Sequence, residues 1–567
     1  LGNFVLLEPK INQSVSRHRI EKKIDEYFDV SRNLASHALM LYELKSIYDN
    51  VFAAEAKKFG LVSGKWQGTK KDLRDKLYST EGGDKSWQKI QGQVYGPSMH
   101  KANLFPGVAR FLLRCKLLGH TVFIVSHKTK YGHFDSSKTL LRQAALDWMH
   151  SKGFFDKDKF SISKENIFFA TTRQEKVEKI STLNLDVFVD DLEEVFAEKS
   201  FPDIKKILFN KKFKNKYHDV ICSNWLSIDN SILGDISDRE MKYIANSIYK
   251  GPINDIEKMN GRGNSRMYKL STSKGNVVLK DYPDLLNDTR KRLVTEVSAL
   301  KMIECFNQTP KVLAFNESQN IAIYEWIKGV HLSSVNDKHI LEALMFIEKI
   351  QKIKGRSPCE LASEACLSAR HLFNQIDDRL RELLLVNNKD LQIFLNTVFR
   401  PLWSQTKEWS NQHWPSDNII NDLPISMQAL SPSDFGFHNA LLEDNKLYFL
   451  DFEYFGRDDP VKLMADFVWH PGMNLSNSQK TIWVNGVFEI FTKDLNIHTR
   501  FHAAWPVYGL RWSLILLNEF LKDGWQKRVY ANNNLKDKQE SKLEDQLNKA
   551  KDICMQIQMT SMECPYV

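Results

Sequence analysis

One short block near the carboxyl end constrains the fold of this 567-residue chain more than any other stretch. It reads Ser-Pro-Ser-Asp-Phe-Gly-Phe-His-Asn over 431–439, and Leu-Tyr-Phe-Leu-Asp-Phe-Glu follows over 447–453. Asp434 and Asn439 stand in a D-x-x-x-x-N spacing, and Asp451 follows an apolar run that predicts a strand. A carboxylate can accept the proton of an attacking hydroxyl group, and Mg²⁺ prefers hard oxygen ligands. The block therefore predicts a loop and a strand end that meet in a site for phosphoryl transfer.

Two glycines and a serine precede a predicted strand upstream of this block. Gly261 and Gly263 lie in the run Asn-Gly-Arg-Gly-Asn-Ser, which ends at Ser265. Glycine lets the backbone approach a phosphate closely, and a serine hydroxyl can donate a hydrogen bond to it. Two glycines alone are a weak signal, so this turn counts only together with the elements that follow it.

Three further features follow in the order that a nucleotide site requires. The strand-like run Asn-Val-Val-Leu-Lys ends at Lys280, and Glu296 lies in a helical pattern shortly after it. In kinases a strand lysine binds the nucleotide phosphates, and a helix glutamate holds its ammonium group. The apolar strand at 321–327, with Glu325 and Ile327, stands where a hinge would contact adenine. A lone lysine or glutamate is usually a surface charge, so the prediction depends on the shared order of these elements.

Together these motifs resemble the aminoglycoside phosphotransferase/choline kinase group of the protein-kinase-like fold, over about residues 240–530. The resemblance is strongest in Leu-Asp-Phe-Glu-Tyr at 450–454, which is followed by Gly-Arg-Asp-Asp-Pro at 456–460. It implies a two-lobed domain that uses ATP and Mg²⁺ to phosphorylate a small molecule.

The resemblance also implies a role for each matching residue. It implies that Asp434 is the catalytic base, that Asn439 and Asp451 bind Mg²⁺, and that Lys280 contacts the ATP phosphates. The sequence departs from the family at Pro432, because the family has a histidine two residues before the base.

The acceptor is expected to be small. Between Asp451 and a helix predicted to begin near Val461 there is no room for a long activation loop, which disfavours a protein kinase. A hydroxyl group of a sugar, amino alcohol or aminoglycoside-like compound in an open cleft fits better. Residues of the late helices are either contacts of this acceptor or helix-packing core: Trp469, Trp505, Tyr508, Arg511 and Trp512.

The amino-terminal third alternates strand-like runs with helical patterns, which predicts an α/β domain with a parallel sheet. One strand ends at Ser126, Lys176 follows in a helical pattern, and a second strand ends at Asp190 and Asp191. This order resembles motifs of the haloacid dehalogenase superfamily. The resemblance implies that Ser126 and Lys176 bind a phosphate and that the two aspartates hold Mg²⁺, whereas a helix cap remains an alternative for the aspartates.

The nucleophile of that superfamily is missing from the expected position. The family has two aspartates, two residues apart, at the end of the first strand, but the run at 3–11 carries only Glu8. Covalent catalysis does not proceed at a useful rate without its nucleophile. We therefore expect a phosphatase-like domain that is inactive and that binds a phosphorylated ligand or orients the kinase.

The expected fold class is multidomain, with an α/β part followed by an α+β part. The predicted parts are a haloacid dehalogenase-like domain at 1–215 with a helical cap at about 20–105, a linker at 216–255, a kinase-like amino-terminal lobe at 256–330 and a helical carboxy-terminal lobe at 331–567.

Composition excludes several other classes. The net charge of +9 is scattered, which argues against a nucleic-acid partner, and no apolar run approaches the length of a membrane span. Seven dispersed cysteines without a C-x-x-C pair argue against disulfides and a zinc site and favour the cytoplasm. The oligomeric state cannot be read from these patterns. Besides a small-molecule kinase, a bifunctional kinase/phosphatase and a nucleotide-binding regulatory protein remain open.

Overall fold

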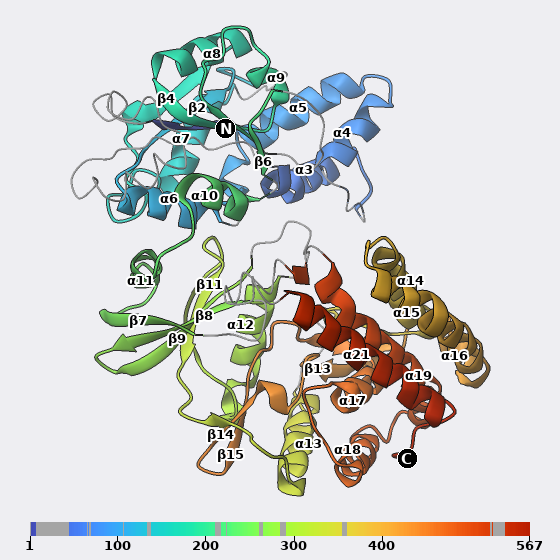
Figure 1. Ribbon diagram of the computed structural model, residues 1–567. Helices are drawn as coiled ribbons and strands as arrows, with labels where there is room; N and C mark the ends of the chain where they lie inside the picture. The colour runs from blue at the N-terminus through green and yellow to red at the C-terminus, as the bar shows by residue number, and fades with distance from the viewer. Residues whose placement is uncertain are drawn as a thin grey trace. The chain divides into compact units, whose positions relative to one another are not determined.

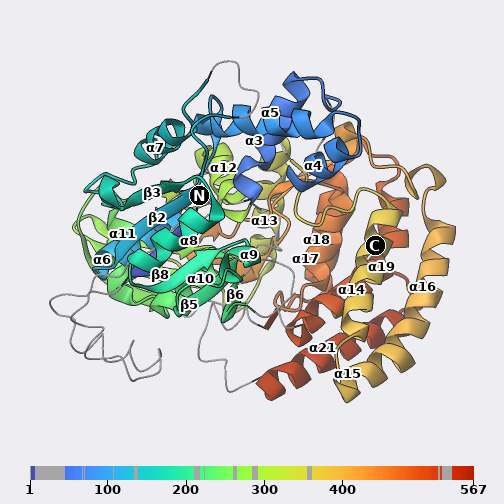
Figure 2. The ribbon, with the colours of Figure 1, turned by 90° about the horizontal axis from the view of Figure 1, so that it is seen from above.

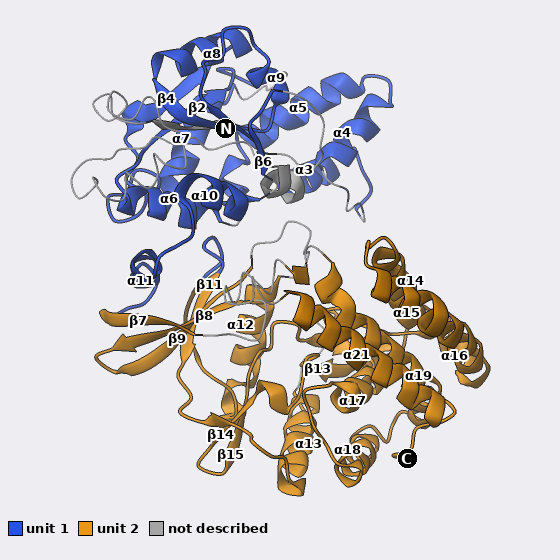
Figure 3. Ribbon diagram, in the orientation of Figure 1, with its two compact units in different colours: residues 1–250, 284–288, 316–320 blue, residues 251–283, 289–315, 321–567 orange. Residues whose placement is uncertain are grey.

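The computed structural model describes residues 2–6, 45–64, 66, 68, 70–105, 107–132, 138–209, 217–222, 224–259, 265–283, 291–353, 360–521, 524–525 and 539–567. For residues 2–6 and 45–50 the description covers the backbone only. The chain divides into two compact units, shown in Figure 3. Unit 1 comprises chiefly residues 1–250, and unit 2 comprises chiefly residues 251–567.

Unit 1 is built on a six-stranded sheet in the order β3-β2-β1-β4-β5-β6. Strand β2 runs parallel to β3, and β4, β5 and β6 run parallel to one another. The strands are β1 (Gly2–Leu6), β2 (Thr121–His127), β3 (Ile167–Ala170), β4 (Leu185–Asp190), β5 (Lys205–Phe209) and β6 (Val220–Cys222).

The central strand β1 corrects the prediction of a parallel sheet, because it runs antiparallel to both of its neighbours. Leu6, its last residue, pairs with Thr121 and Leu185, which are the first residues of β2 and β4. An apolar run predicts a strand but carries no sign of its direction, which depends on the path of the chain between strands. The sheet is therefore mixed.

Helices α6, α8 and α10 of unit 1 pack against strands of this sheet (Figures 1 and 2). Helices α3, α4 and α5 pack on one another within the predicted cap, and residues 7–44 lie outside the description. The helices are α3 (Lys45–Lys58), α4 (Lys70–Tyr78), α5 (Gly83–Tyr95), α6 (Val108–Leu117), α7 (Leu141–Ser151), α8 (Arg173–Thr182), α9 (Glu193–Phe196), α10 (Trp225–Leu233) and α11 (Asp238–Asn246).

The segment predicted to be a linker, 216–255, carries regular structure of unit 1. It contains β6, α10 and α11, and α11 begins with a capping box between Ser237 and Glu240. Buried Arg114 of α6 lies 2.9 Å from Asp229 of α10 and 2.8 Å from Glu240 of α11. These ion pairs join α10 and α11 to α6. Charged residues that the sequence alone suggests are exposed are therefore buried between helices.

Unit 2 begins with a five-stranded sheet in the order β10-β11-β9-β8-β7, next to which α12 lies (Figure 1). Strands β7, β8, β9 and β11 pair antiparallel along this order. The elements are β7 (Ile253–Met259), β8 (Arg266–Thr272), β9 (Gly275–Asp281), α12 (Arg292–Ile303), β10 (Val312–Asn316) and β11 (Ile321–Glu325).

The rest of unit 2 is mostly helical, as the sequence predicts, with two short strand pairs between the helices. Helices α14, α16 and α21 all pack against the long helix α19 (Figures 1 and 2). The helices are α13 (Asp337–Gln351), α14 (Ala369–Leu384), α15 (Lys389–Phe394), α16 (Arg400–His413), α17 (Pro460–Trp469), α18 (Asn477–Ile490), α19 (Ile497–Leu516) and α21 (Gln539–Met559).

Two strand pairs carry the motif residues between these helices. Strands β14 and β15 form a hairpin that β12 extends, and β13 pairs with β16. Their bounds are β12 (Val330–His331), β13 (Ala429–Ser431), β14 (Ala440–Glu443), β15 (Lys446–Phe449) and β16 (Gly456–Asp458). Among the described residues, no helix is long and apolar enough to cross a membrane.

Candidate active site

Lys280 lies near the end of β9, where it faces a glutamate of α12. Its register partner is Ala322 of β11, so the lysine lies in the interior of the sheet rather than on an edge strand. Lys280 Nζ lies 2.7 Å from Glu296 Oε2, and both side chains are almost fully buried. The structure thus brings together the strand lysine and the helix glutamate that the sequence singled out.

Asp451 reaches the same ammonium group from the other part of unit 2. Its Oδ1 lies 2.7 Å from Lys280 Nζ, and Glu453 Oε2 lies 3.1 Å from the same nitrogen. Asp451 follows β15 in a left-handed backbone conformation, with a φ of 66°. Such a conformation is uncommon for a residue other than glycine and often occurs at functional sites. Three carboxylates therefore share the ammonium group of one lysine.

Burial and charge act against each other in this cluster. Burial lowers the pKa of Lys280, but the carboxylates of Asp451, Glu296 and Glu453 outweigh it and raise that pKa well above its usual value. Burial also raises the pKa of Asp451, with a further contribution from the neighbouring glutamates. Lys280 and Arg292, in contrast, hold the pKa of Glu453 below its usual value although burial raises it. The cluster is therefore a charged network that depends on Lys280.

Sequence reasoning did not assign a role to Glu453 or to its second partner. Arg292, the first residue of α12, forms an ion pair with Glu453 and a hydrogen bond to Tyr454. Tyr282, which follows β9, donates a 2.6 Å hydrogen bond to Glu296 Oε2. The only sequence signal for these residues is that Glu453 belongs to the Asp-Phe-Glu motif. Their contacts join β9, α12 and the segment after β15.

Asp434 and Asn439 lie on one loop, which a short 3-10 helix, η7 (Phe437–Asn439), closes. Asn439 Nδ2 donates to the backbone oxygen of Asp434 at 3.0 Å and approaches its Oδ2 at 3.4 Å. The backbone oxygen of Asn439 accepts a 2.8 Å hydrogen bond from Leu450 N, one residue before Asp451. The β14–β15 hairpin thus brings the D-x-x-x-x-N loop next to the second aspartate.

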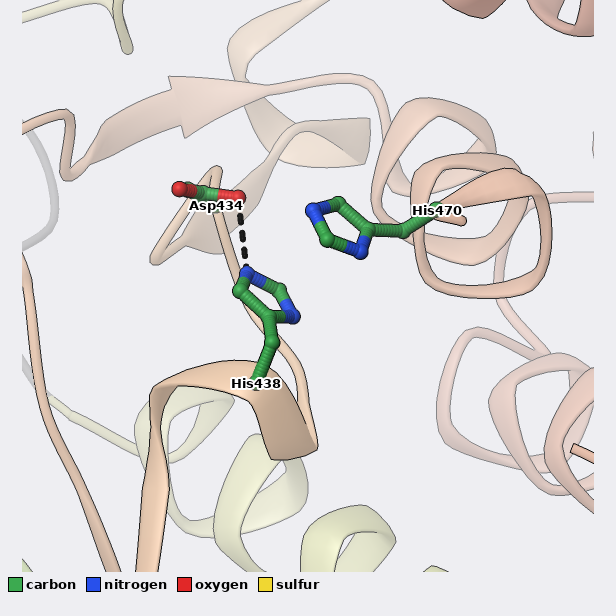
Figure 4. Close-up of side chains that lie close together, drawn as sticks. All are labelled: Asp434, His438 and His470. Carbon is green, nitrogen blue, oxygen red and sulfur yellow. Dashed lines mark hydrogen bonds and ion pairs between the residues drawn. The ribbon is translucent and has the colours of Figure 1, made fainter. Parts of the chain in front are cut away.

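Two histidines lie beside Asp434, as Figure 4 shows. His438 Nε2 lies 3.1 Å from Asp434 Oδ1, and the ring of His470 stacks on the ring of His438. Burial raises the pKa of Asp434, but the hydrogen bond from His438, the charges of both histidines and the amide of Asn439 hold it well below its usual range. Burial, together with His438, lowers the pKa of His470 to about 3. Asp434 is therefore an ionised hydrogen-bond acceptor at neutral pH.

The start of this loop shows how the chain accommodates Pro432. Ser433 has a left-handed backbone with a φ of 70°, and its amide donates to Ser431 Oγ at 3.0 Å. Buried Lys462 of α17 donates to Ser433 Oγ at 3.2 Å. Contacts to Ser433 and to the Asp434 side chain therefore hold the loop.

The other residues predicted to contact the nucleotide are either outside the described residues, buried before β8, or at the end of β11. Gly261 and Gly263 lie outside the described residues. Ser265 is buried just before β8, and its Oγ has no hydrogen-bond partner among the described residues. Glu325 ends β11, and Ile327 is buried two residues later. Their placement next to β9 agrees with a hinge, but no contact in the structure assigns them to a nucleotide.

The late-helix residues considered as acceptor contacts are buried in the core of unit 2. The rings of Trp469 and Trp505 pack at a centroid distance of 4.5 Å, and Trp469 Nε1 donates to the backbone oxygen of Trp505. Trp512 Nε1 and Arg511 both donate to Asp466 Oδ1. These side chains are therefore helix-packing core rather than exposed acceptor contacts: Trp469, Trp505, Tyr508, Arg511 and Trp512.

The carboxylates around Asp451 are hard oxygen donors, but Lys280 Nζ already lies within 3.1 Å of an oxygen of Glu296, Asp451 and Glu453. Oxygens of Glu296, Asp451 and Glu453 lie within 4.8 Å of one another. Because Asn439 uses its amide nitrogen toward Asp434, its Oδ1 is the atom that can ligate a cation. An all-oxygen set of carboxylates and an amide is what Mg²⁺ prefers.

Unit 1 holds the second predicted cluster at the ends of β2 and β4. Lys176 Nζ lies 2.5 Å from Asp190 Oδ2, and both side chains are buried. Ser126 is buried as well, and its Oγ has no hydrogen-bond partner among the described residues. Burial raises the pKa of Asp191 to about 8. The structure thus pairs Lys176 with Asp190, whereas Glu8 lies outside the described residues.

The direction of β1 bears on this cluster. Gly2 pairs with Val125 of β2 and Asn3 pairs with Val189 of β4, so β1 begins beside Ser126 and Asp190. The carboxyl end of β1 lies at the opposite edge of the sheet. The end of this strand therefore does not present a residue to Ser126 and Asp190 in the way that a parallel strand would.

The sequence matches no family model and no curated protein. Among solved structures, it is similar to choline kinase from Cryptosporidium parvum Iowa II, at 12% identity and a TM-score of 0.37, covering 57% of this chain and 98% of that chain. It is also similar to choline kinase LicA from Streptococcus pneumoniae, at 13% identity and a TM-score of 0.37, covering 54% of this chain and 94% of that chain. Spectinomycin phosphotransferase APH(9)-Ia, in complex with ADP and spectinomycin, is similar at 10% sequence identity and a TM-score of 0.39. The match covers 56% of this chain and 98% of that chain. With TM-scores this low, these likenesses carry no argument, and the functional conclusion depends on the site itself.

Proposed function

We propose that this protein is an ATP- and Mg²⁺-dependent kinase that phosphorylates a hydroxyl group of a small molecule. Unit 2 would carry the activity on a protein-kinase-like fold. The observation that carries this proposal is the position of Lys280, whose ammonium contacts Glu296 at 2.7 Å and Asp451 at 2.7 Å. A strand lysine held by a helix glutamate and facing a metal-binding aspartate is the arrangement that phosphoryl transfer uses.

Each residue of the site has a separate role in the proposed reaction. Lys280 binds the phosphates of ATP, and Ser265 donates its buried hydroxyl to them. Asn439 and Asp451 hold Mg²⁺, which neutralises charge on the phosphates. Asp434 orients the acceptor hydroxyl and accepts its proton as the oxygen attacks the terminal phosphorus and the bond to ADP breaks. The backbone after β11, at Glu325 and Ile327, contacts adenine.

Asp434 acts in this scheme both by its position and by accepting the proton of the hydroxyl group. Its lowered pKa makes it a weak base, but phosphoryl transfer needs little proton abstraction before the transition state. An ionised carboxylate that is fixed beside the acceptor hydroxyl group provides the alignment on which the rate depends.

The acceptor is a sugar, an amino alcohol or an aminoglycoside-like compound. Helix α17 begins at Pro460, shortly after Asp451, and the intervening residues are occupied by β16 and its pairing with β13. No segment of that length can form the peptide-binding platform of a protein kinase. A small molecule that approaches Asp434 directly fits the partial exposure of that side chain.

ADP release from Mg²⁺-ATP tests this proposal against a panel of sugars, amino alcohols, nucleosides and aminoglycosides. We expect turnover that depends on one class of acceptor, and Asp434→Ala to abolish it while ATP binding persists. ATP binding without turnover in any panel member would favour a nucleotide-binding regulatory protein. A protein that does not bind ATP would refute the kinase assignment.

We also propose that unit 1 binds a phosphorylated ligand without hydrolysing it, as an inactive relative of the haloacid dehalogenase superfamily would. The Oγ of Ser126, which has no hydrogen-bond partner in the part of the chain that the structure describes, favours this function, because a buried hydroxyl without a partner is costly unless a ligand accepts its hydrogen bond. Lys176, in the first turn of α8, supplies a positive charge, although Asp190 already pairs with it.

A phosphatase assay separates this proposal from a bifunctional kinase/phosphatase. Hydrolysis of a general phosphoester that disappears in Asp190→Asn would establish the bifunctional enzyme. We expect no hydrolysis by the wild-type chain, and binding of inorganic phosphate that Ser126→Ala weakens. Equal phosphate binding by the wild type and this variant would refute the role of Ser126.

A further inference from the structure

The loop residue that should orient the base is absent from this chain, yet the base is held. Kinase-like loops of the resembled family place a histidine two residues before the catalytic aspartate, whereas Pro432 occupies that position here. His438, four residues after Asp434, instead places its Nε2 3.1 Å from Asp434 Oδ1. An ionised carboxylate can only accept, so His438 donates from Nε2.

A second histidine fixes the plane of the first. The rings of His438 and His470 stack at a centroid distance of 3.7 Å with an interplanar angle of 9°. His470 follows α17, and its ring and that of Trp512 from α19 form a T-shaped pair at a centroid distance of 4.7 Å and an interplanar angle of 82°. Figure 4 shows both rings beside the carboxylate of Asp434. The stack thus connects the loop to two helices of the core.

Two glycines leave the space that these rings fill. A Cβ atom on Gly436 would lie 2.5 Å from Met473 Sδ and 2.8 Å from His438 Nδ1, and one on Gly472 would lie 3.0 Å from His470 Cε1. Real Cβ atoms essentially never approach another heavy atom more closely than 3.0 Å, so a side chain at either glycine would press on a neighbouring histidine ring. The backbone on both sides of the stack is therefore shaped around two imidazoles.

The hydrogen bonds of these rings argue against a metal site at the same three residues. Oxygen and nitrogen atoms of Asp434, His438 and His470 lie within 4.8 Å of one another, as metal ligands can. A ligating histidine usually donates its second ring N–H to an acceptor. Here the backbone N–H of Gly472 donates to His470 Nδ1 at 3.1 Å, so Nδ1 is an acceptor and a neutral ring carries its proton on Nε2. Two parallel, stacked rings also cannot both direct a nitrogen lone pair at one ion.

We propose that His438 and His470 are positioning residues for Asp434 and replace the histidine that Pro432 displaces. His438 supplies the hydrogen bond that sets the rotation of the carboxylate, and His470 supplies the flat surface that sets the plane of His438. This inference rests on the proposed kinase function, since Asp434 must be the group that meets the acceptor hydroxyl.

The two histidines contribute different properties, and crossed substitutions separate them. At position 438 the donor matters, so His438→Gln, which keeps an N–H, is expected to retain more activity than His438→Phe. At position 470 the ring matters, so His470→Phe is expected to retain more activity than His470→Ala. For the two damaging variants and for Gly436→Ala we expect kcat to fall about 10- to 100-fold with the KM for ATP nearly unchanged. The assay is ADP release from Mg²⁺-ATP with the acceptor of highest turnover in the panel.

A matched control comes from another stacked histidine of unit 2. His498, near the start of α19, stacks on Phe488 of α18 at the same 3.7 Å centroid distance, and neither residue has a role in the proposed site. His498→Ala should therefore leave kcat and the KM for ATP near the wild-type values. A loss equal to that of His470→Ala would show that the effect is merely one of stability and would refute the proposal.

The outcomes distinguish this inference from the kinase proposal itself. If Asp434→Ala abolishes turnover but the histidine variants do not change kcat, the positioning role is wrong and the kinase function stands. If His470→Phe is as damaging as His470→Ala and Zn²⁺ inhibits the wild type but not either variant, the cluster is a metal site. A second readout needs no acceptor. In protein with nitrogen-15-labelled histidine, NMR should show His470 protonated on Nε2, and the opposite tautomer would overturn the proposal.

Discussion

Lys280 Nζ lies 2.7 Å from Asp451 Oδ1, although 171 positions separate the two residues in the chain. Neither residue is informative alone, because a strand lysine or an Asp-Phe-Glu motif is common in proteins. Their contact joins the sheet that carries β9 to the helical part of unit 2, and it places the lysine that we propose binds phosphate beside the aspartate that we propose binds Mg²⁺.

Asp434→Asn should lower kcat by about 10²- to 10⁴-fold, the range of a lost acid–base group, and leave the affinity for ATP within a few fold. The amide has the same shape but cannot accept the hydroxyl proton. Acceptor-dependent ADP release and equilibrium ATP binding measure the two effects. Asp444→Asn, on the exposed tip of the β14–β15 hairpin, is the matched control and should behave as the wild type. Equal activity of both variants would exclude Asp434 as the base.

Lys280→Met should abolish ATP binding and also destabilise unit 2. The substitution leaves three carboxylates without their shared cation, and removing one partner of a buried ion pair costs about 3–5 kcal/mol. Hydrogen exchange of unit 2 peptides in increasing urea measures the loss.

Lys301→Met provides the control for Lys280→Met, because Lys301 lies exposed on α12 near its end. Its unfolding midpoint should match that of the wild type. A midpoint for Lys280→Met that equals this control would show that the carboxylate cluster does not depend on the lysine.

Asp191→Asn should make unit 1 less sensitive to alkaline pH. Burial raises the folded-state pKa of Asp191 to about 8, above the ordinary carboxyl value of the unfolded chain. The folded state then binds the proton more tightly, so stability is fully present at low pH and is lost as pH rises through the interval up to about 8. In a chelator-containing buffer, the melting temperature of the wild type should fall over this interval more than that of Asp191→Asn. Parallel pH profiles would contradict the raised pKa.

Gly456→Ala should weaken the β13–β16 pair. A Cβ atom on Gly456 would lie 2.4 Å from the backbone nitrogen of Ala362 and 2.6 Å from the carbonyl carbon of Leu361. These are backbone atoms that cannot rotate away, so we expect a loss of about 1–3 kcal/mol, the range for overpacking. Because Gly456 pairs with Ser431 next to the catalytic loop, kcat should fall as well. Gly64→Ala meets no atom within 4 Å and should be neutral. Equal unfolding midpoints for the two variants would refute the clash.

Much of unit 2 could be predicted from its sequence, because the informative signals are local. Alternation of apolar residues predicts β9 and β11, helical periodicity predicts α12, and the spacing of Asp434 and Asn439 predicts a loop with two polar groups on one side. Their order along the chain favours phosphoryl transfer, which stays a prediction. The prediction of a linker at 216–255 missed the helices of this segment. Asp229 and Glu240 are buried against Arg114, but in the sequence their charges look like those of exposed residues.

The sequence by itself determined which chemical groups this protein has and which local elements carry them, since side-chain periodicity and spacing depend only on near neighbours. The tertiary structure alone decided how distant groups meet: that Glu453 shares Lys280 with Asp451, that His470 stacks on His438, and that β1 runs against β2. It also decided that the tryptophans of α17 and α19 pack in the core. Strand direction and packing depend on the whole path of the chain, because burial and pairing are satisfied between segments that no local pattern connects.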